Sequence, residues 1–266
     1  MISLVQLLNE SQGEPKAIIL AGAPGAGKGY VLKGLDLSGL KIMNIDNTFI
    51  SMLKQANVTL DLKNATPEER SKQAQAMAAA NKEFKGELQN VIAGKESFVL
   101  DGTAASLKQT SLLKDQLEEA GYKVAMLYVY TDLERSLKQN QDRFEKSGGE
   151  DRSLAPAIVM RTWKNVTDNL DPYFDLFEPN FIAVANTLEG DKIDNVEDII
   201  KKYLDPYKPK GTKPKSPAQQ KRSEEQKAEL NAAIQTMLSD EFNDEVLQSM
   251  ISKEEAQMRI AQFLRS

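Results

Sequence analysis

The sequence predicts an α/β fold, in which a parallel β-sheet lies between two layers of helices. Three observations support this prediction. Five short apolar runs alternate with helical stretches, and the first run leads directly into a glycine-rich loop. Continuous apolar runs are typical of strands that are buried on both faces of a parallel sheet. The five expected strands are residues 17–20, 41–45, 97–100, 124–130 and 181–185.

The stretches between these runs carry local helix signals. Thr66 can cap the helix that follows it, Pro67 suits a first turn, and Glu68 and Glu69 interact favourably with the helix dipole. Gly121 is placed to end another helix. Strands that alternate with helices imply right-handed crossovers within one sheet. We expect helices over residues 29–37, 66–92, 106–120, 133–144, 155–170 and 193–204.

The chain divides into one large domain and an appendage. It has 266 residues, 41% of them apolar, which is enough for one sizeable core. Residues 1–205 contain all five expected strands, and residues 206–217 are rich in proline and lysine, which predicts a stiff, extended linker. Residues 218–266 show apolar stripes at helical spacing and predict a helical tail. This tail can dock on the large domain, self-associate or bind another protein.

Composition excludes several kinds of chemistry. The chain has no cysteine and no histidine, so disulfides, thiolate metal sites and a histidine general base are ruled out. Acid–base chemistry must therefore use carboxylates, lysine, tyrosine or the substrate itself. The net charge of −5 argues against nucleic-acid binding through a global positive field. The first apolar run, residues 1–8, lacks a basic leader, and no run is long enough for a membrane span. We expect an amphipathic helix there, a cytoplasmic location and no membrane partner.

The glycine-rich loop has the spacing G-x-x-x-x-G-K and lies between an expected strand and an expected helix. Its glycines let backbone N–H groups turn toward phosphate oxygens, and the helix dipole favours the anion. Lys28 supplies a charge for the terminal phosphates. The alternative is a tight turn with one solvated lysine. The candidate nucleotide-binding residues are Gly22, Ala23, Pro24, Gly25, Ala26, Gly27, Lys28, Gly29 and Tyr30.

Gly29 stands where the common motif has a Ser or Thr that ligates Mg²⁺. The segment "GAPGAGKG" nevertheless resembles the loop of adenylate kinases, in which glycine is usual at this position. Tyr30 follows where that loop usually has threonine. The tyrosine can crowd a phosphate, or its hydroxyl can substitute for that of threonine. A metal ion is then held through waters and carboxylates, which Mg²⁺ tolerates.

Two aspartates come directly after expected strands, and the carboxyl ends of parallel strands face the ligand crevice. Asp46 can accept a proton from a substrate hydroxyl, although the pattern also suits a helix cap. Asp101 in "FVLDGT" can orient Mg²⁺ through water, although Asp-Gly is also a common turn. We predict functional roles for both carboxylates because they occur together with the upstream glycine loop.

Arginines surround the glycine pair at residues 148–149. Arg143 and Arg152 can close over the terminal phosphate and neutralise transition-state charge, whereas Arg135 lies further from the glycines. The alternative is an ordinary charged helix face paired with nearby glutamates. The candidate catalytic residues are therefore Lys28, Asp46, Asp101, Arg143 and Arg152.

The order of these features resembles the zeta-toxin and polynucleotide-kinase-like branch of the P-loop kinases. The matching segments are "AGAPGAGKG", the strand before Asp46, "FVLDGT" and "RFEKSGGEDRSLAP", and they extend over residues 16–205. The resemblance implies a three-layer P-loop fold with strand order 2-3-1-4-5. It also implies a lid over about residues 140–156, with Arg143, Arg152 and Pro156 in matching places.

The resemblance further implies ATP or GTP as phosphate donor, Mg²⁺ as cofactor and Asp46 as the base. Acceptors in that branch are hydroxyls of small molecules, nucleotide sugars, nucleotides or polynucleotide ends. Asn186 and Thr187 lie where such kinases often contact the nucleotide base. We therefore expect an ATP-dependent kinase. The alternative is a nucleotide-binding module that has lost catalysis and whose tail serves in protein interaction or assembly. A GTPase is disfavoured because the sequence has no N-K-x-D motif.

Overall fold

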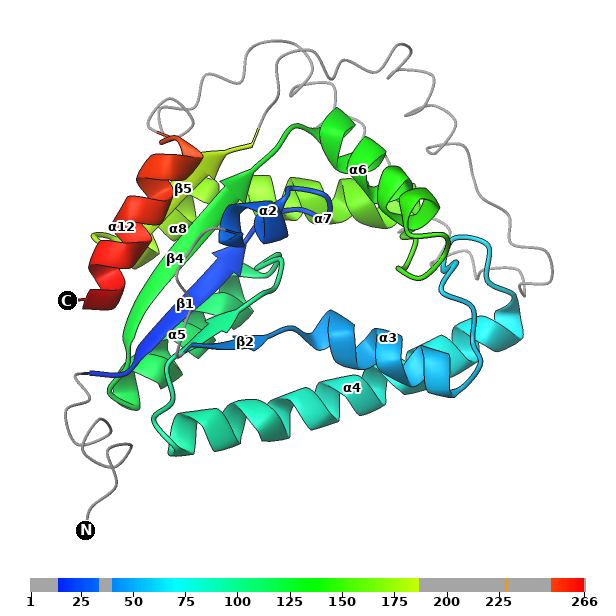
Figure 1. The fold of residues 1–266 in the computed structure, drawn as a ribbon, viewed down its shortest axis with the longest axis horizontal. Helices are drawn as coiled ribbons and strands as arrows, with labels where there is room; N and C mark the ends of the chain where they lie inside the picture. Colours follow the sequence, from blue (N-terminus) through cyan, green and yellow to red (C-terminus); the bar gives the residue numbers. More distant parts are fainter. Residues whose placement is uncertain (1–13, 34–39, 187–227, 229–249, 266) are drawn as a thin grey trace.

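A computed structural model describes residues 14–33, 40–186, 228 and 250–265 of the chain. Its centre is a five-stranded parallel sheet with strand order β2-β3-β1-β4-β5 (Figure 1). The α/β class, the five strands and their order are thereby confirmed. The strands are β1 (Lys16–Ala21), β2 (Lys41–Met43), β3 (Phe98–Leu100), β4 (Lys123–Tyr130) and β5 (Phe181–Ala185).

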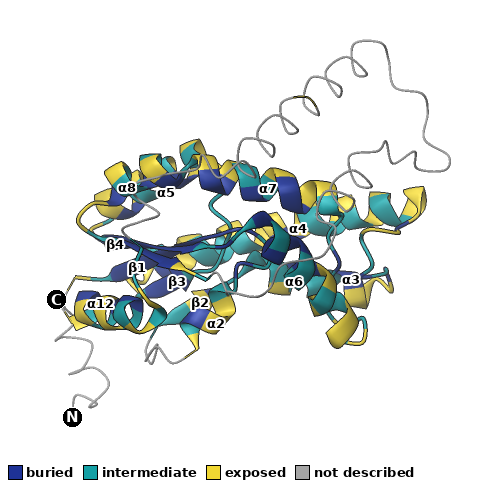
Figure 2. Ribbon diagram, turned by 90° about the horizontal axis from the view of Figure 1, so that it is seen from above, coloured by how far each residue is buried: buried dark blue, intermediate teal, exposed yellow. Residues whose placement is uncertain are grey.

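Helices cover both faces of this sheet (Figure 2). One face packs against α4, α5, α7 and α8, and the other packs against α2 and α12. The described helices are α2 (Lys28–Leu32), α3 (Ile45–Gln55), α4 (Pro67–Ala93), α5 (Leu107–Glu119), α6 (Leu133–Lys146), α7 (Pro156–Asp168), α8 (Leu170–Phe177) and α12 (Lys253–Arg265).

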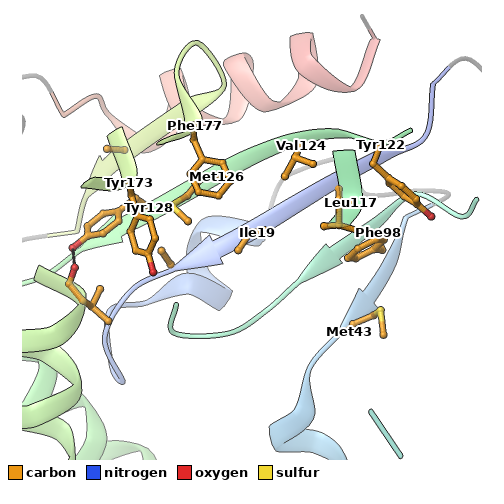
Figure 3. Close-up of a cluster of buried hydrophobic side chains, with 14 of the residues drawn as sticks. Ile19, Met43, Phe98, Leu117, Tyr122, Val124, Met126, Tyr128, Tyr173 and Phe177 are labelled. Atoms are coloured by element: carbon orange, nitrogen blue, oxygen red, sulfur yellow. Dashed lines mark hydrogen bonds between the residues drawn. The ribbon is translucent and has the colours of Figure 1, made fainter. Parts of the chain in front are cut away.

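The continuous apolar runs are explained by this double cover. In β1, Ile19 joins one core cluster, whereas the next residue along the strand, Leu20, joins the other. Figure 3 shows the first cluster, in which Tyr128 of β4 lies near Tyr173 and Phe177 of α8. Both faces of the central strands are therefore buried from solvent, so neither face needs polar side chains.

Several helix boundaries differ from the expected ones. The helix expected over residues 155–170 is α7, which ends at Asp168, and a separate helix, α8, begins at Leu170 and extends to Phe177 beyond the expected range. The strand expected over residues 41–45 ends at Met43, because Asn44 caps α3. The capped start near Thr66 is as expected, with a reciprocal capping box to Glu69. The expected helices at residues 1–8 and 193–204, the linker and the tail up to residue 249 (Ala228 excepted) lie outside the described residues.

The end of the chain packs on the sheet. Ala256, Ile260 and Phe263 of α12 are buried in the second core cluster. The N–H of Ile251 donates to the Ala183 carbonyl at 3.1 Å, so the segment before α12 adds to the edge of β5. Residues 250–265 thus complete one face of the fold. No helix among the described residues is long and apolar enough to cross a membrane.

We predict that Ile260→Ala lowers the free energy of unfolding by about 2–5 kcal/mol, because it empties a fully buried site under the sheet. Met258→Ala on the same helix is the matched control, since Met258 is 66% exposed and its truncation should change stability by less than about 0.5 kcal/mol. Urea denaturation measures both. Equal stabilities of the two variants would show that α12 does not contribute to the core.

Candidate active site

The glycine-rich loop joins the end of β1 to the start of α2. Gly25 and Gly27 have φ angles of 81° and 80°, which L side chains rarely adopt. Neighbouring atoms also leave no room for a side chain at either position. A Cβ at Gly25 would lie 2.7 Å from the Ser136 carbonyl oxygen, and one at Gly27 would lie 2.2 Å from Nδ2 of Asn186. The loop is therefore pressed between α6 and the end of β5, and these two positions require glycine.

The loop presents backbone donors. Within the described part of the chain, the N–H groups of Gly25, Gly27, Lys28 and Gly29 make no hydrogen bond. The last two belong to the first turn of α2, where a helix leaves its N–H groups without internal partners. Consecutive donors of this kind, together with the positive end of a helix, bind an anion such as phosphate.

Lys28 lies at the centre of the charged groups. Its Nζ donates to the carbonyls of Gly22 at 2.8 Å and Ala23 at 3.1 Å. Burial lowers the pKa of Lys28 to about 8, while the nearby carboxylates of Asp101 and Asp46 act in the opposite direction. Arg143 and Arg152 lower this pKa further. The fold thus brings the other four candidate catalytic residues within electrostatic reach of Lys28.

The two aspartates are held together by a residue that sequence reasoning missed. Asn44 follows β2 and caps α3 by accepting from the Asp46 N–H at 2.8 Å. Its Nδ2 donates to Asp101 Oδ2 at 2.7 Å. Asn44 therefore bridges the ends of two neighbouring strands and orients one carboxylate. The available signal was an asparagine two residues before an aspartate, which is a common cap.

The two candidate arginines differ in placement. Arg152 has a mostly buried side chain, and its Nη2 forms an ion pair with Asp46. Arg143 is more exposed, and its Nε pairs with Asp151 in the loop that follows α6. Of the two arginines, Arg152 thus contacts another candidate catalytic residue directly, whereas Arg143 acts on Lys28 through its charge.

Arg152 is anchored through the next residue, Ser153. The Ser153 hydroxyl donates to Asp61 Oδ1 at 2.6 Å, and its N–H donates to the Leu60 carbonyl at 3.1 Å. Although burial opposes it, hydrogen bonds from Ser153 and Asn64 lower the pKa of Asp61. These contacts tie the loop after α6 to the loop between α3 and α4. The sequence carried no signal for this connection, because the two loops are far apart along the chain.

The remaining loop residues are placed as follows. Tyr30 is 59% exposed, and its ring lies 3.7 Å from the Lys253 ammonium of α12. A Cβ at Gly29 would meet nothing within 4 Å. Asn186 donates from Nδ2 to the Ala26 carbonyl at 2.8 Å, so it supports the loop backbone. Its neighbour Thr187 lies outside the described residues.

The residues present fit a magnesium site in which the protein supplies only one or two ligands. Within the described ranges, no group of three or more Asp and Glu side chains converges on one point. Asp101 and Asp46 are the carboxylates that act on Lys28. Mg²⁺ commonly takes one or two carboxylates and completes its shell with substrate phosphates and water. This donor set therefore suits a metal that arrives with a phosphorylated ligand.

Comparison with known proteins gives both a family and a fold. The family model described as Zeta toxin matches residues 4–189. No curated protein matches the chain. A structure of the PezAT chromosomal toxin–antitoxin system of Streptococcus pneumoniae is similar with a TM-score of 0.50 and 15% identity, covering 87% of this chain and 94% of that chain.

Two structures of the AvrRxo1-ORF1:AvrRxo1-ORF2 complex are also similar. The complex with sulphate ions has a TM-score of 0.53, and the complex with ATP has a TM-score of 0.51. Each is 18% identical, and each alignment covers 88% of this chain and 80% of that chain. At these identities the structural likeness establishes a shared fold.

We predict that Gly27→Ala weakens binding of inorganic tripolyphosphate by at least about tenfold, since the added Cβ clashes with Asn186 and strains the backbone. Gly29→Ala is the control, because its Cβ meets nothing in the protein and the common motif has a larger residue there. Isothermal titration calorimetry measures both. Equal loss in the two variants, or no loss in either, would contradict the loop geometry.

Proposed function

We propose that this chain, which belongs to the zeta toxin family, is an ATP-dependent kinase that phosphorylates a hydroxyl group. One observation carries the proposal. Lys28, two strand-end carboxylates and two arginines of the lid region meet beside a row of unpaired backbone donors. Phosphoryl transfer depends mainly on positioning and on neutralising charge, and this arrangement supplies both without a histidine.

The donor nucleotide binds through the glycine-rich loop. The N–H groups of the loop and the Lys28 ammonium hold the β- and γ-phosphates. We prefer ATP to GTP because a fold relative has been captured with ATP and the sequence lacks a guanine-specifying motif. Asp101, oriented by Asn44, would hold Mg²⁺ through water. When bound, the metal would supply charge neutralisation for the terminal phosphates.

The transfer step uses Asp46 and Arg152. The acceptor oxygen bonds to the γ-phosphorus as the bond from that phosphorus to the β,γ-bridging oxygen breaks. ADP leaves with the bridging oxygen, and the hydroxyl proton passes to the Asp46 carboxylate. Arg152 already contacts Asp46, so its charge lies where the transferring group must pass. Arg143 adds a second positive charge from the end of α6.

The acceptor binds on the side where Asp46 lies, bounded by α3, the loop before α4 and the segment around Arg152. The contact of Ser153 with Asp61 connects these last two parts. The acceptor class extends over small molecules, nucleotide sugars, nucleotides and polynucleotide ends. The rival function is nucleotide binding without transfer, which the unusual Tyr30 favours.

Transfer from radiolabelled ATP to a panel of nucleotide sugars, nucleosides, nucleotides and 5′-hydroxyl oligonucleotides tests the proposal. We predict that Asp46→Asn lowers transfer at least about a hundredfold, because the proton acceptor is lost, while ATP binding is kept. Asp142→Asn is the control, since this carboxylate pairs with Lys146 on the outer part of α6. Tight ATP binding with no transfer to any compound would instead support the rival function.

We also predict that ATP affinity falls as the pH rises above about 8. Free Lys28 loses its proton near this pH, whereas the bound triphosphate requires the ammonium, so binding takes up one proton. ATP is fully ionised in this range, so the loss approaches about tenfold per pH unit.

Calorimetry from about pH 7 to about pH 10 measures this dependence. Lys28→Arg should bind more weakly but keep its affinity constant over this range, because its guanidinium stays charged. A flat profile for the unmodified protein would show that Lys28 is not the titrating group.

A further inference from the structure

The last described helix, α12, lies beside α2 on the same face of the sheet (Figure 2). Gln257 of α12 donates from Nε2 to the carbonyls of Val31 at 3.3 Å and Lys33 at 3.1 Å. These carbonyls are at the C-terminal end of α2, where a helix leaves its acceptors without internal donors. One side chain of α12 therefore closes the end of the short phosphate-loop helix.

A second side chain of α12 reaches the middle of α2. Lys253 lies four residues before Gln257, on the same helix face. Its ammonium lies 3.7 Å from the centre of the Tyr30 ring. Tyr30 is the third residue of α2, directly after two of the unpaired N–H donors. Lys253 thus places a positive charge over the side chain of Tyr30, the residue that directly follows these donors in the sequence.

The position of α12 does not depend on these two contacts alone. Ala256 and Ile260 are fully buried against the sheet, and Lys16 of β1 donates from Nζ to the Leu264 carbonyl at 3.2 Å. Ile251 pairs with the edge of β5 just before the helix. The helix is therefore fixed by the core, and Lys253 and Gln257 are presented to α2 from a rigid support.

We propose that α12 is part of the nucleotide site. Lys253 attracts the triphosphate, and Gln257 holds α2 in the position that aims its N–H donors. The inference rests on the proposed nucleotide binding, but not on the transfer step. It also has a reciprocal consequence: if α12 strengthens nucleotide binding, then bound nucleotide strengthens the docking of α12 by the same factor.

Charge at Lys253 is tested by calorimetry with ATP at low ionic strength. We expect Lys253→Met to weaken ATP binding about threefold and Lys253→Glu about tenfold, as for one partly exposed charge near an anion. The Met variant keeps an apolar stem over Tyr30, which separates charge from packing. Both effects should shrink in about 0.5 M salt, because exposed charges are screened.

Arg259→Ala is the matched control, since it removes one positive charge from the same helix but from a residue that is paired with Glu255. Its ATP affinity should equal that of the unmodified protein. Unchanged affinity in Lys253→Glu would overturn the inference and leave the kinase proposal standing. ATP binding that depends on Lys253 but leads to no transfer would overturn the kinase proposal and leave the inference about α12 standing. A complete lack of ATP binding by the unmodified protein would overturn both.

Reciprocal coupling is tested by amide hydrogen exchange on the full chain. We expect ADP to slow exchange in residues 253–265 of the unmodified protein, and Gln257→Ala to remove at least half of this protection. Thermal unfolding checks that the variant remains folded. Equal exchange with and without ADP, when calorimetry shows that ADP is bound, would overturn the coupling.

Discussion

The site depends on holding one lysine ammonium inside the fold. The Lys28 ammonium donates hydrogen bonds to the Gly22 and Ala23 carbonyls of its own loop, and burial lowers the pKa of Lys28 to about 8. A partly desolvated cation is costly unless anions compensate it. The surrounding carboxylates supply part of that compensation, and a bound polyphosphate supplies more. The glycine-rich loop, which we propose as the phosphate site, is therefore an arrangement that gains stability when an anionic ligand binds.

The compensating groups converge because of strand order. β3 lies between β1 and β2, so Asp101 at its end lies between the glycine loop and Asn44. All three strands are parallel, and their carboxyl ends meet at one edge of the sheet. Asn44 then connects the two strand ends with one amide group, because its oxygen accepts from the Asp46 backbone N–H and its nitrogen donates to the Asp101 carboxylate. The first bond caps α3, and the second orients the carboxylate of Asp101.

Segments from elsewhere in the chain complete the site from two directions. The loop after α6 brings Arg152 to Asp46, and it is tied down through Ser153 and Asp61. In addition, α12 contacts the middle of α2 through Lys253 and its C-terminal end through Gln257. These contacts are polar and lie around a buried apolar core, so they position groups without determining the fold.

The sequence by itself determined the α/β class, the five strands and the phosphate loop, because periodicity, caps and glycine spacing are local properties. The same local pattern pointed to Asp46, Asp101 and Arg152, which follow strands or flank glycines. Only the tertiary structure decided that Asn44 orients the Asp101 carboxylate, that Arg152 pairs with Asp46, and that α12 closes α2. These pairings join residues from 57 to 226 positions apart, and separation of that kind leaves no periodic trace in a single sequence.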